Sequence, residues 1–232
     1  MLRIPLILGL ALAASAGHAA NFTPPKGCQL QATVQNRGCS VSQYYQCQAD
    51  PAGHQRTAIF GKDGLRHLSR IDAETRWIES SDPNTGLADF LVERSKDHAS
   101  FKTLLETGQD DFDFWTESNT GERLRNVGQD ILTGETVEID GETLEVTRFQ
   151  LKTYDANGEL LIERSGQQFI SRKMGRFFGG VEVQSDWTGA RQETNDSPVT
   201  FAFPGEAGFG DAEPQYDCDQ LLTQLLHERA WR

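Results

Sequence analysis

The basic cluster of this acidic chain combines three cations with aromatic side chains. Arg172, Lys173 and Arg176 lie next to Phe177 and Phe178. Cations can bind an anionic head group, and neighbouring rings can contact an apolar chain. This chemistry predicts a docking patch for an amphipathic anion or an acidic partner. The alternative is that the phenylalanines pack in the core, as such pairs more often do, while the cations pair with nearby acids.

Two further aromatic residues are expected to contribute to a binding surface. Phe101 lies in a predicted helix and Trp115 in a predicted strand. Aromatic residues make up 9% of the chain, and the concave face of a curved sheet can be lined by them. The expected ligand is a lipid or a small apolar molecule. The candidate ligand-binding residues are Phe101, Trp115, Arg172, Lys173, Arg176, Phe177 and Phe178.

Motifs of well-known catalytic and cofactor chemistry do not occur in the sequence. There is no G-x-S-x-G nucleophile elbow, no H-E-x-x-H motif and no P-loop. Gly208-Phe209-Gly210 lacks the third glycine of a dinucleotide-binding loop. We therefore name no catalytic residue and expect no cofactor. An enzyme with an acid–base pair outside these motifs stays open, and buried titratable groups sharing one pocket would favour it.

Residue types that bind metals are present, but their spacing does not match a metal motif. Asp110, Asp111 and Asp113 could offer oxygen ligands to calcium, yet they do not follow the EF-hand pattern. We interpret them as part of a strand with one acidic, solvated face. The histidines beyond the N-terminal segment are isolated from one another, and we expect no metal site; they are His54, His67, His98 and His227.

Charge and composition exclude several classes of protein. The chain has 232 residues, with 22 Lys and Arg against 34 Asp and Glu, for a net charge of -12. So acidic a protein is not expected to bind nucleic acid through the phosphate backbone. Hydrophobic residues make up 37%, which is too many for a disordered chain. The length suits one sizeable core.

The first 19 residues have the pattern of a secretory signal peptide. Arg3 is followed by an apolar run over Ile4–Ala14 and then by small residues. An apolar run this short does not span a bilayer, which needs about 20 residues. Gly17-His18-Ala19 favours cleavage after Ala19, with cleavage after Ala20 as the alternative. The mature chain has no second long apolar run, so no transmembrane span is expected.

The four cysteines of an exported chain are expected to form two disulfides. Asn36-Arg37-Gly38 is a turn signal between two strand-like segments. If Arg37 and Gly38 form a two-residue loop, position 36 faces 39 and Cys28 faces Cys47 across the hairpin. Cys39 would then pair with Cys218. The spacing of the four cysteines does not match a zinc motif.

Short strand-like segments separated by turn signals follow one another along most of the chain. Asp63-Gly64 and Asp140-Gly141 are typical of hairpin turns. Two of the predicted strands are Arg123–Val127 and Thr136–Ile139, the second of which leads into Asp140-Gly141. Thr143–Tyr154 is the clearest strand, and its apolar side changes midway, which indicates either a bulge or a strand long enough to change neighbours. Roughly ten strands at about ten-residue spacing favour an antiparallel meander over βαβ units.

Two segments have helical spacing instead. Asp97–Thr107 places Phe101, Leu104 and Leu105 on one face, with Asp97 as the expected cap and Gly108 as the stop. This helix is expected to plug or cover the concave face. Residues 219–232 carry a leucine stripe that predicts a short C-terminal helix, which either packs on the sheet or binds a partner.

The predicted fold is mainly β, an antiparallel meander that forms a curved sheet or half-barrel, with one internal helix and a short C-terminal helix. We expect a signal peptide over residues 1–19, a single all-β domain over 20–218 and the C-terminal helix over 219–232. A sheet of this many strands usually curls or closes to hide its edges.

Several segments resemble a family of exported alphaproteobacterial proteins that lack an assigned function. The resemblance covers most of the mature chain but rests on turn and helix-end residues, so it implies a fold and not an activity. The architecture is also similar to that of periplasmic lipoprotein carriers, whose half-barrel shelters acyl chains. The segments are Pro51-Ala52-Gly53-His54, Ser69-Arg70-Ile71-Asp72, Leu104-Leu105-Glu106-Thr107-Gly108, Leu132-Thr133-Gly134-Glu135-Thr136-Val137, Asp196-Ser197-Pro198 and Tyr216-Asp217-Cys218.

These observations predict an exported protein, periplasmic in preference to extracellular. Its expected function is non-catalytic binding of a hydrophobic or amphipathic envelope ligand in a curved sheet. The alternative is an envelope structural protein that binds a protein partner through its acidic surface or its C-terminal helix.

Overall fold

The computed structural model describes residues 21–219, and all its strands belong to one antiparallel sheet. The order across the sheet is β13-β12-β10-β9-β8-β7-β6-β5-β4-β3-β2-β1-β14, with the short β11 paired to β10. The strands are β1 (Cys28–Asn36), β2 (Ser40–Cys47), β3 (Gln55–Gly61), β4 (Gly64–Ile71), β5 (Trp77–Ser81), β6 (Ala88–Leu91), β7 (Gln109–Ser118), β8 (Arg123–Ile139), β9 (Glu142–Tyr154), β10 (Leu160–Ser171), β11 (Arg176–Phe178), β12 (Val181–Asp186), β13 (Arg191–Asn195) and β14 (Pro198–Ala202).

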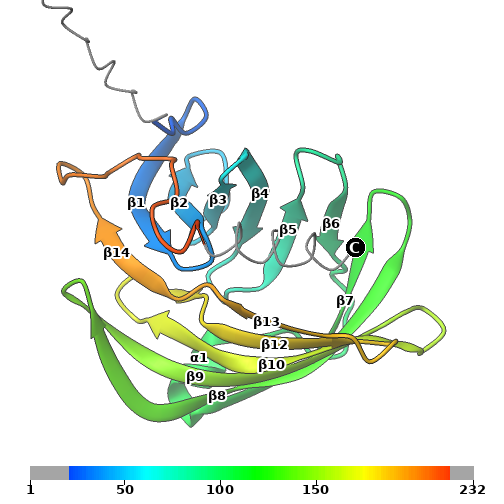
Figure 1. The fold of residues 1–232 in the computed structure, drawn as a ribbon. Coiled ribbons are helices and arrows are strands. Elements are labelled where there is room, and N and C mark those ends of the chain that lie inside the picture. Colours follow the sequence, from blue (N-terminus) through cyan, green and yellow to red (C-terminus); the bar gives the residue numbers. More distant parts are fainter. Residues whose placement is uncertain (1–20, 220–232) are drawn as a thin grey trace, which may run out of the picture.

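The meander predicted from the turn signals is confirmed, because nearly every strand pairs with its neighbour in the chain. The sheet bends strongly, so that β1–β6 form one arm and β8–β10 form a second arm facing it (Figure 1). Within the described residues, the end strands β13 and β14 do not pair with one another. The sheet is therefore curved but open.

The second arm contains longer strands than the sequence predicted. Arg123–Val127 and Thr136–Ile139, expected as separate strands, belong to one continuous β8. The pairing of β8 with β9 shifts between Leu132 and Thr136, where Gly134 has φ 80°. The extra residues lie on β8, whereas β9 keeps one unbroken register with β10 from Thr153 to Glu145. The apolar side of β9 changes because Leu144 and Val146 pack in one buried cluster, while Phe149 and Leu151 belong to another.

The N-terminal hairpin has the predicted disulfide but a different turn. Asn36 pairs with Ser40, so the loop has three residues and not the two expected. An irregularity between Leu30 and Ala32 adds one residue to β1 and restores the register. Cys28 consequently does face Cys47, and the two form a disulfide with an S–S distance of 1.95 Å.

The predicted second disulfide, between Cys39 and Cys218, is also present, with an S–S distance of 2.08 Å. The segment before Cys218 lies along the N-terminal hairpin. Cys39 N–H donates to the carbonyl of Tyr216 at 3.0 Å, and Gln35 Nε2 donates to that of Glu213 at 3.0 Å. The disulfide therefore ties two ends of the described chain together.

The internal helix, α1 (Phe101–Thr107), is shorter than predicted and begins later. Its N-cap is Ser100, whose hydroxyl accepts from the N–H of Thr103 at 3.1 Å, and not Asp97. Asp97 instead exchanges backbone hydrogen bonds with Asp113 of β7. Gly108 ends the helix in the left-handed conformation, as predicted.

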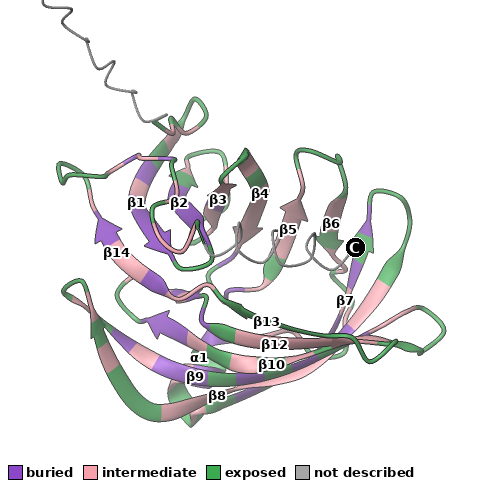
Figure 2. Cartoon of the chain, in the orientation of Figure 1, coloured by how far each residue is buried: buried purple, intermediate pink, exposed green. Residues whose placement is uncertain are grey.

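The main core lies where the ends of the two arms meet. Val34 and Tyr44 of the first arm pack with Leu144 and Phe169 of the second, and β14 contributes Phe201. Figure 2 shows this buried concentration along β1, β2 and β14, whereas β13 is exposed throughout. A smaller buried cluster lies on β7 and β9 and consists of Phe112, Phe114, Phe149 and Leu151.

The predicted signal peptide and nearly all of the predicted C-terminal helix lie outside the described residues. Among residues 21–219, no helix has the length and apolarity required to cross a membrane. The two disulfides indicate an oxidising compartment reached by export.

Candidate functional site

A cavity of about 610 Å³ lies between the two arms of the sheet. Residues from β4 to β12 contribute to its walls, so it extends across most of the concave face. Its size is within the range of about 300–1,000 Å³ that is typical of small-molecule sites. The side chains that line it include His67, Ser69, Arg70, Ile71, Arg76, Trp77, Ser80, Asp89, Leu91, His98, Phe112, Phe114, Thr116, Asn126, Asp130, Phe149, Leu151, Thr153, Ile162, Arg164, Gln168, Arg176 and Phe177.

Strand alternation decides which side chains reach the cavity. On β7, Phe112 and Phe114 line it, while the intervening Asp113 lies on the other face and pairs with Arg125. On β9, Phe149 and Leu151 line it in the same way. Successive side chains of a strand point to opposite faces, which places each of these apolar pairs on the concave side of its strand.

One glycine makes room for the aromatic wall. Gly128 of β8 pairs with Phe112 of β7. A Cβ at this position would lie 2.8 Å from the ring of Phe112 and 2.2 Å from the carbonyl oxygen of Gln150. The absence of a side chain therefore lets the ring lie across the neighbouring strand.

The aromatic wall continues to the surface through Trp77 of β5. The ring of Trp77 packs edge-on against Phe114, with centroids 5.6 Å apart. It is about half exposed, at 48%, although it lines the cavity. Trp77 therefore extends from the apolar interior of the cavity to the solvent.

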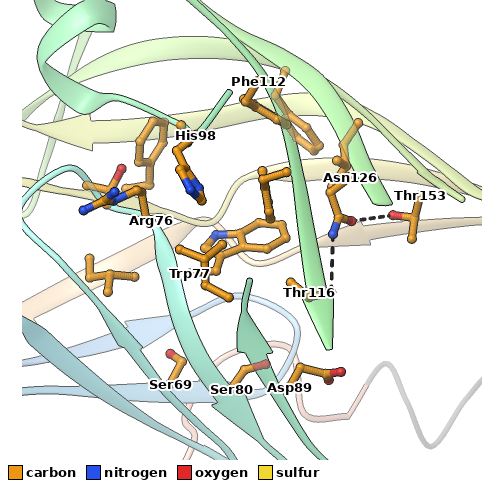
Figure 3. A pocket seen from close by; sticks show the side chains of 18 of the residues that line it. Ser69, Arg76, Trp77, Ser80, Asp89, His98, Phe112, Thr116, Asn126 and Thr153 are labelled. Atoms are coloured by element: carbon orange, nitrogen blue, oxygen red, sulfur yellow. Dashed lines mark hydrogen bonds between the residues drawn. The ribbon is translucent and has the colours of Figure 1, made fainter. Parts of the chain in front are cut away.

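Polar groups cross the same wall in a hydrogen-bonded row (Figure 3). Asn126 of β8 donates to the hydroxyl of Thr116 on β7 at 3.5 Å and accepts from Thr153 on β9 at 3.0 Å. The three side chains are buried, and their polar groups are largely satisfied within the row. The row therefore leaves little hydrogen-bonding capacity for a ligand.

A carboxyl group with an altered pKa also lines the cavity. Asp130 of β8 lies directly across the ladder from Asp110 of β7. Burial, with a smaller effect of the Asp110 carboxylate, raises the pKa of Asp130 to about 7. Burial also raises the pKa of Asp110, although the N–H of Ser100 donates to its carboxylate at 2.7 Å.

Unpartnered buried polar atoms concentrate at this cavity. Among the described residues, four buried side-chain N or O atoms lack a hydrogen-bond partner, and three belong to residues that line it. They are Nε of Arg70, Nδ1 of His98 and Nε of Arg176. His98 Nε2 donates to the carbonyl of Glu93 at 3.0 Å, so in the neutral ring Nδ1 is a free acceptor. Such groups have a capacity for hydrogen bonds that the protein does not use.

Three of the residues predicted for binding lie at or beside this cavity. Arg176 and Phe177 line it directly. Phe101 of α1 packs edge-on against Phe177, with ring centroids 5.6 Å apart, and lies at a small adjoining hollow. The helix therefore lies at the edge of the cavity, where it packs on β7 and β8.

The other four predicted residues lie elsewhere. Arg172 pairs with Glu145, and Lys173 pairs with Glu142 at 2.8 Å. Phe178 is buried in the main core. For these three residues the structure matches the alternative of core packing and local ion pairs.

Trp115 does not contribute to the cavity either. It lies between Phe114 and Thr116, and therefore on the opposite face of β7. Its ring lies 5.4 Å from the guanidinium of Arg123. The alternation of the strand was visible in the sequence, but which face is concave was not.

Several cavity residues were missed by sequence analysis. Phe112, Phe149 and Trp77 lie on strands that are far apart in the chain, and only the bend of the sheet brings them together. Asp130 lies in a stretch that was assigned to neither of the two predicted strands around it. The one available signal was the alternation of apolar residues along β7.

None of the described lining hydroxyl groups is arranged as an activated nucleophile. Among the described lining residues, no hydroxyl group hydrogen-bonds to a histidine or a carboxylate, and free cysteines are absent. Asp130 has a pKa at which it could exchange a proton near neutral pH. Asp110 and Asp130 partly meet the expectation that an acid–base site would contain titratable groups lying together. No activated nucleophile accompanies them among the described lining residues.

Comparisons with protein-family models, curated proteins and solved structures give no match to this chain. Its functional interpretation therefore depends on the geometry of the cavity.

Proposed function

We propose that this is a periplasmic protein that binds a hydrophobic or amphipathic envelope ligand between the arms of its curved sheet. The observation that carries the proposal is the cavity of about 610 Å³ with its wall of Phe112, Phe114, Phe149 and Leu151. Apolar walls with a few polar groups are typical of sites for small molecules. The two disulfides and the N-terminal signal pattern support export.

The architecture supports a ligand of small-molecule size. The concave face is lined by apolar side chains over several adjacent strands, but the main core occupies only the end where the arms meet. The wall residues themselves are buried, and the apolar surface left at the cavity, to which the half-exposed Trp77 contributes, is stabilised when an apolar ligand covers it. An acyl chain or a comparable flexible apolar group has the right chemistry.

The direct test is titration of the purified mature protein with the neutral dye N-phenyl-1-naphthylamine, whose fluorescence rises in apolar sites. We expect saturable binding to the wild-type protein. Leu151→Trp places a large side chain in the cavity and should weaken binding about tenfold or more. Gln150→Trp is the matched control, because Gln150 is exposed on the opposite face of the same strand and should leave binding unchanged.

A second cavity variant keeps the test decisive if Leu151→Trp does not fold. Ser80 lines the opposite arm and is only half-buried, so Ser80→Phe should reduce the cavity with less disturbance of the core (Figure 3). Circular dichroism and thermal unfolding verify the fold of each variant. Equal dye binding by wild type and folded cavity variants would refute the proposal.

Native mass spectrometry of protein from its own periplasm, followed by organic extraction, identifies the natural ligand. A co-purifying lipid or apolar molecule supports the proposal. Protein without ligand, combined with absent dye binding, would favour the envelope partner-binding alternative. Deletion of residues 219–232 then tests that alternative through loss of partner recovery in a folded protein.

A further inference from the structure

Among the described residues, one arginine of the cavity has no acidic partner. Four arginines line it, and three of them form ion pairs with carboxylates. These pairs are Arg70 with Glu79 at 2.9 Å, Arg76 with Asp72, and Arg164 with Glu182 at 3.4 Å. For Arg176, no carboxylate of the described residues lies within 4.0 Å.

The neutral groups around Arg176 hold its side chain in place without compensating its charge. Nη1 donates to Oε1 of Gln55 at 3.1 Å, and Nη2 donates to the hydroxyl of Thr57 at 2.9 Å. The guanidinium lies over the ring of Tyr44, 3.6 Å from its centroid. Nε is buried and has no hydrogen-bond partner in the described chain.

This arrangement leaves a fixed positive charge at the cavity. Arg176 is 5% exposed, and burial lowers its pKa to about 10, so it stays protonated at neutral pH. A buried charge is costly unless an opposite charge compensates it. In a protein with a net charge of -12, the lack of a carboxylate partner at this arginine is unusual, since acidic residues outnumber basic ones.

From the unpaired Arg176 at the border of the aromatic cavity, we infer that the ligand is an amphipathic anion whose oxyanion head group binds Arg176 and whose apolar chain lies along the aromatic wall. This inference rests on the proposed function and names the chemical class of the ligand. A carboxylate or a phosphate monoester could supply the head group, because the shared chemistry is an oxygen anion that accepts from a guanidinium. Phe177, next to Arg176 in the chain, also lines the cavity.

Four acidic residues line the cavity, and their positions and charges are compatible with an anionic head group at Arg176. Asp89 lies on β6, three strands along the sheet from β3, whose Gln55 and Thr57 hold Arg176. Glu79 and Glu182 are paired with arginines. The raised pKa of Asp130 leaves that carboxyl largely protonated below pH 7. Arg176 is therefore the cavity cation whose charge is available to a ligand.

The test compares three probes that share one alkyl chain: dodecanoate, dodecanol and dodecylammonium. Each displaces N-phenyl-1-naphthylamine from the mature protein at concentrations below micelle formation. We expect dodecanoate to bind about tenfold or more tighter than dodecanol, because a hydrogen bond to a charged group contributes about that much. Dodecylammonium should bind most weakly. Dodecyl phosphate then distinguishes the two head-group sources by whether it binds more tightly than dodecanoate.

Arg176→Met should abolish the preference for dodecanoate while dodecanol still binds. Arg172→Met is the matched control, because Arg172 is exposed, pairs with Glu145 and lies outside the cavity. It should keep the full preference. If Arg176→Met does not fold, Arg176→Lys keeps the charge and should keep dodecanoate ahead of dodecanol.

Two results would overturn the inference without touching the proposed function: equal binding of dodecanoate and dodecanol by the wild type, or an undiminished preference in folded Arg176→Met. Failure of all three probes and of the dye would instead overturn both proposals.

Discussion

Replacing Asp130 by asparagine isolates the effect of one buried carboxyl on stability. Asparagine has nearly the same shape and carries no charge at any pH. The pKa of Asp130 is about 7 in the folded protein, against a usual value of 3.8. The folded state therefore binds a proton over a pH range in which the unfolded state has released it.

The sign of the effect follows from this difference in bound protons. Between pH 4 and pH 7 the folded state holds more protons than the unfolded state, so the free energy of unfolding falls as the pH rises. Above pH 7 both states have released the proton, and the free energy of unfolding falls no further on account of this carboxyl. At about 1.4 kcal/mol per pKa unit, the total loss from this carboxyl is about 4 kcal/mol.

Asp130→Asn should remove this loss. Near pH 4 the variant and the wild type should have similar stability, because the wild-type carboxyl is protonated. At pH 8 the variant should be more stable by up to about 4 kcal/mol. Urea unfolding, followed by tryptophan fluorescence with both disulfides intact, measures the difference at each pH.

Asp111→Asn is the control, because Asp111 is exposed on the opposite face of the neighbouring strand. It should change stability little at any pH. A difference between wild type and Asp130→Asn that stays constant from pH 5 to pH 8 would refute the reasoning. It would show that Asp130 is not held in an environment that favours its protonated form.

Three further changes test the packing. Replacing Cys39 and Cys218 by alanine should lower the free energy of unfolding by about 5 kcal/mol in the chain-entropy model, since they are 179 residues apart. Equal loss on removing the hairpin disulfide, which joins cysteines 19 residues apart, would contradict that model. Gly128→Ala should cost about 1–3 kcal/mol and weaken dye binding, because the ring of Phe112 must move; an unchanged Tm would contradict the close approach. Leu104→Ala, at a fully buried position in α1, should cost about 2–5 kcal/mol in urea unfolding, and a loss below 1 kcal/mol would mean that the helix is loosely packed.

Local features of the fold were predictable because they depend on near neighbours in the chain. The Cys28–Cys47 disulfide was found from a turn signal and strand pairing, even though the loop has one residue more than expected. A compensating irregularity in β1 keeps Cys28 opposite Cys47. No short-range pattern of the sequence predicted this irregularity. The cap at Ser100 was missed because Ser100 and Asp97 are both good capping residues, and tertiary pairing with Asp113 engages Asp97.

The candidate site was much less predictable than the fold. The sequence singled out Arg176 and Phe177 as part of a basic, aromatic segment, but it could not separate them from Arg172, Lys173 and Phe178. The difference depends on whether a carboxylate such as Glu145 lies within reach, and Glu145 is on another strand. Asp130 could not be recognised, since its altered pKa results from burial between the arms.

The sequence by itself determined the class of the fold and the alternation of each strand, and it indicated the pairing of the cysteines. These properties follow from turn chemistry and from the two-residue period of a strand, which act over short distances. Only the tertiary structure decided which face became concave, which residues line the cavity and which arginine was left without a counter-charge. Those properties depend on the bend of the whole sheet, which brings together side chains from strands far apart in the chain.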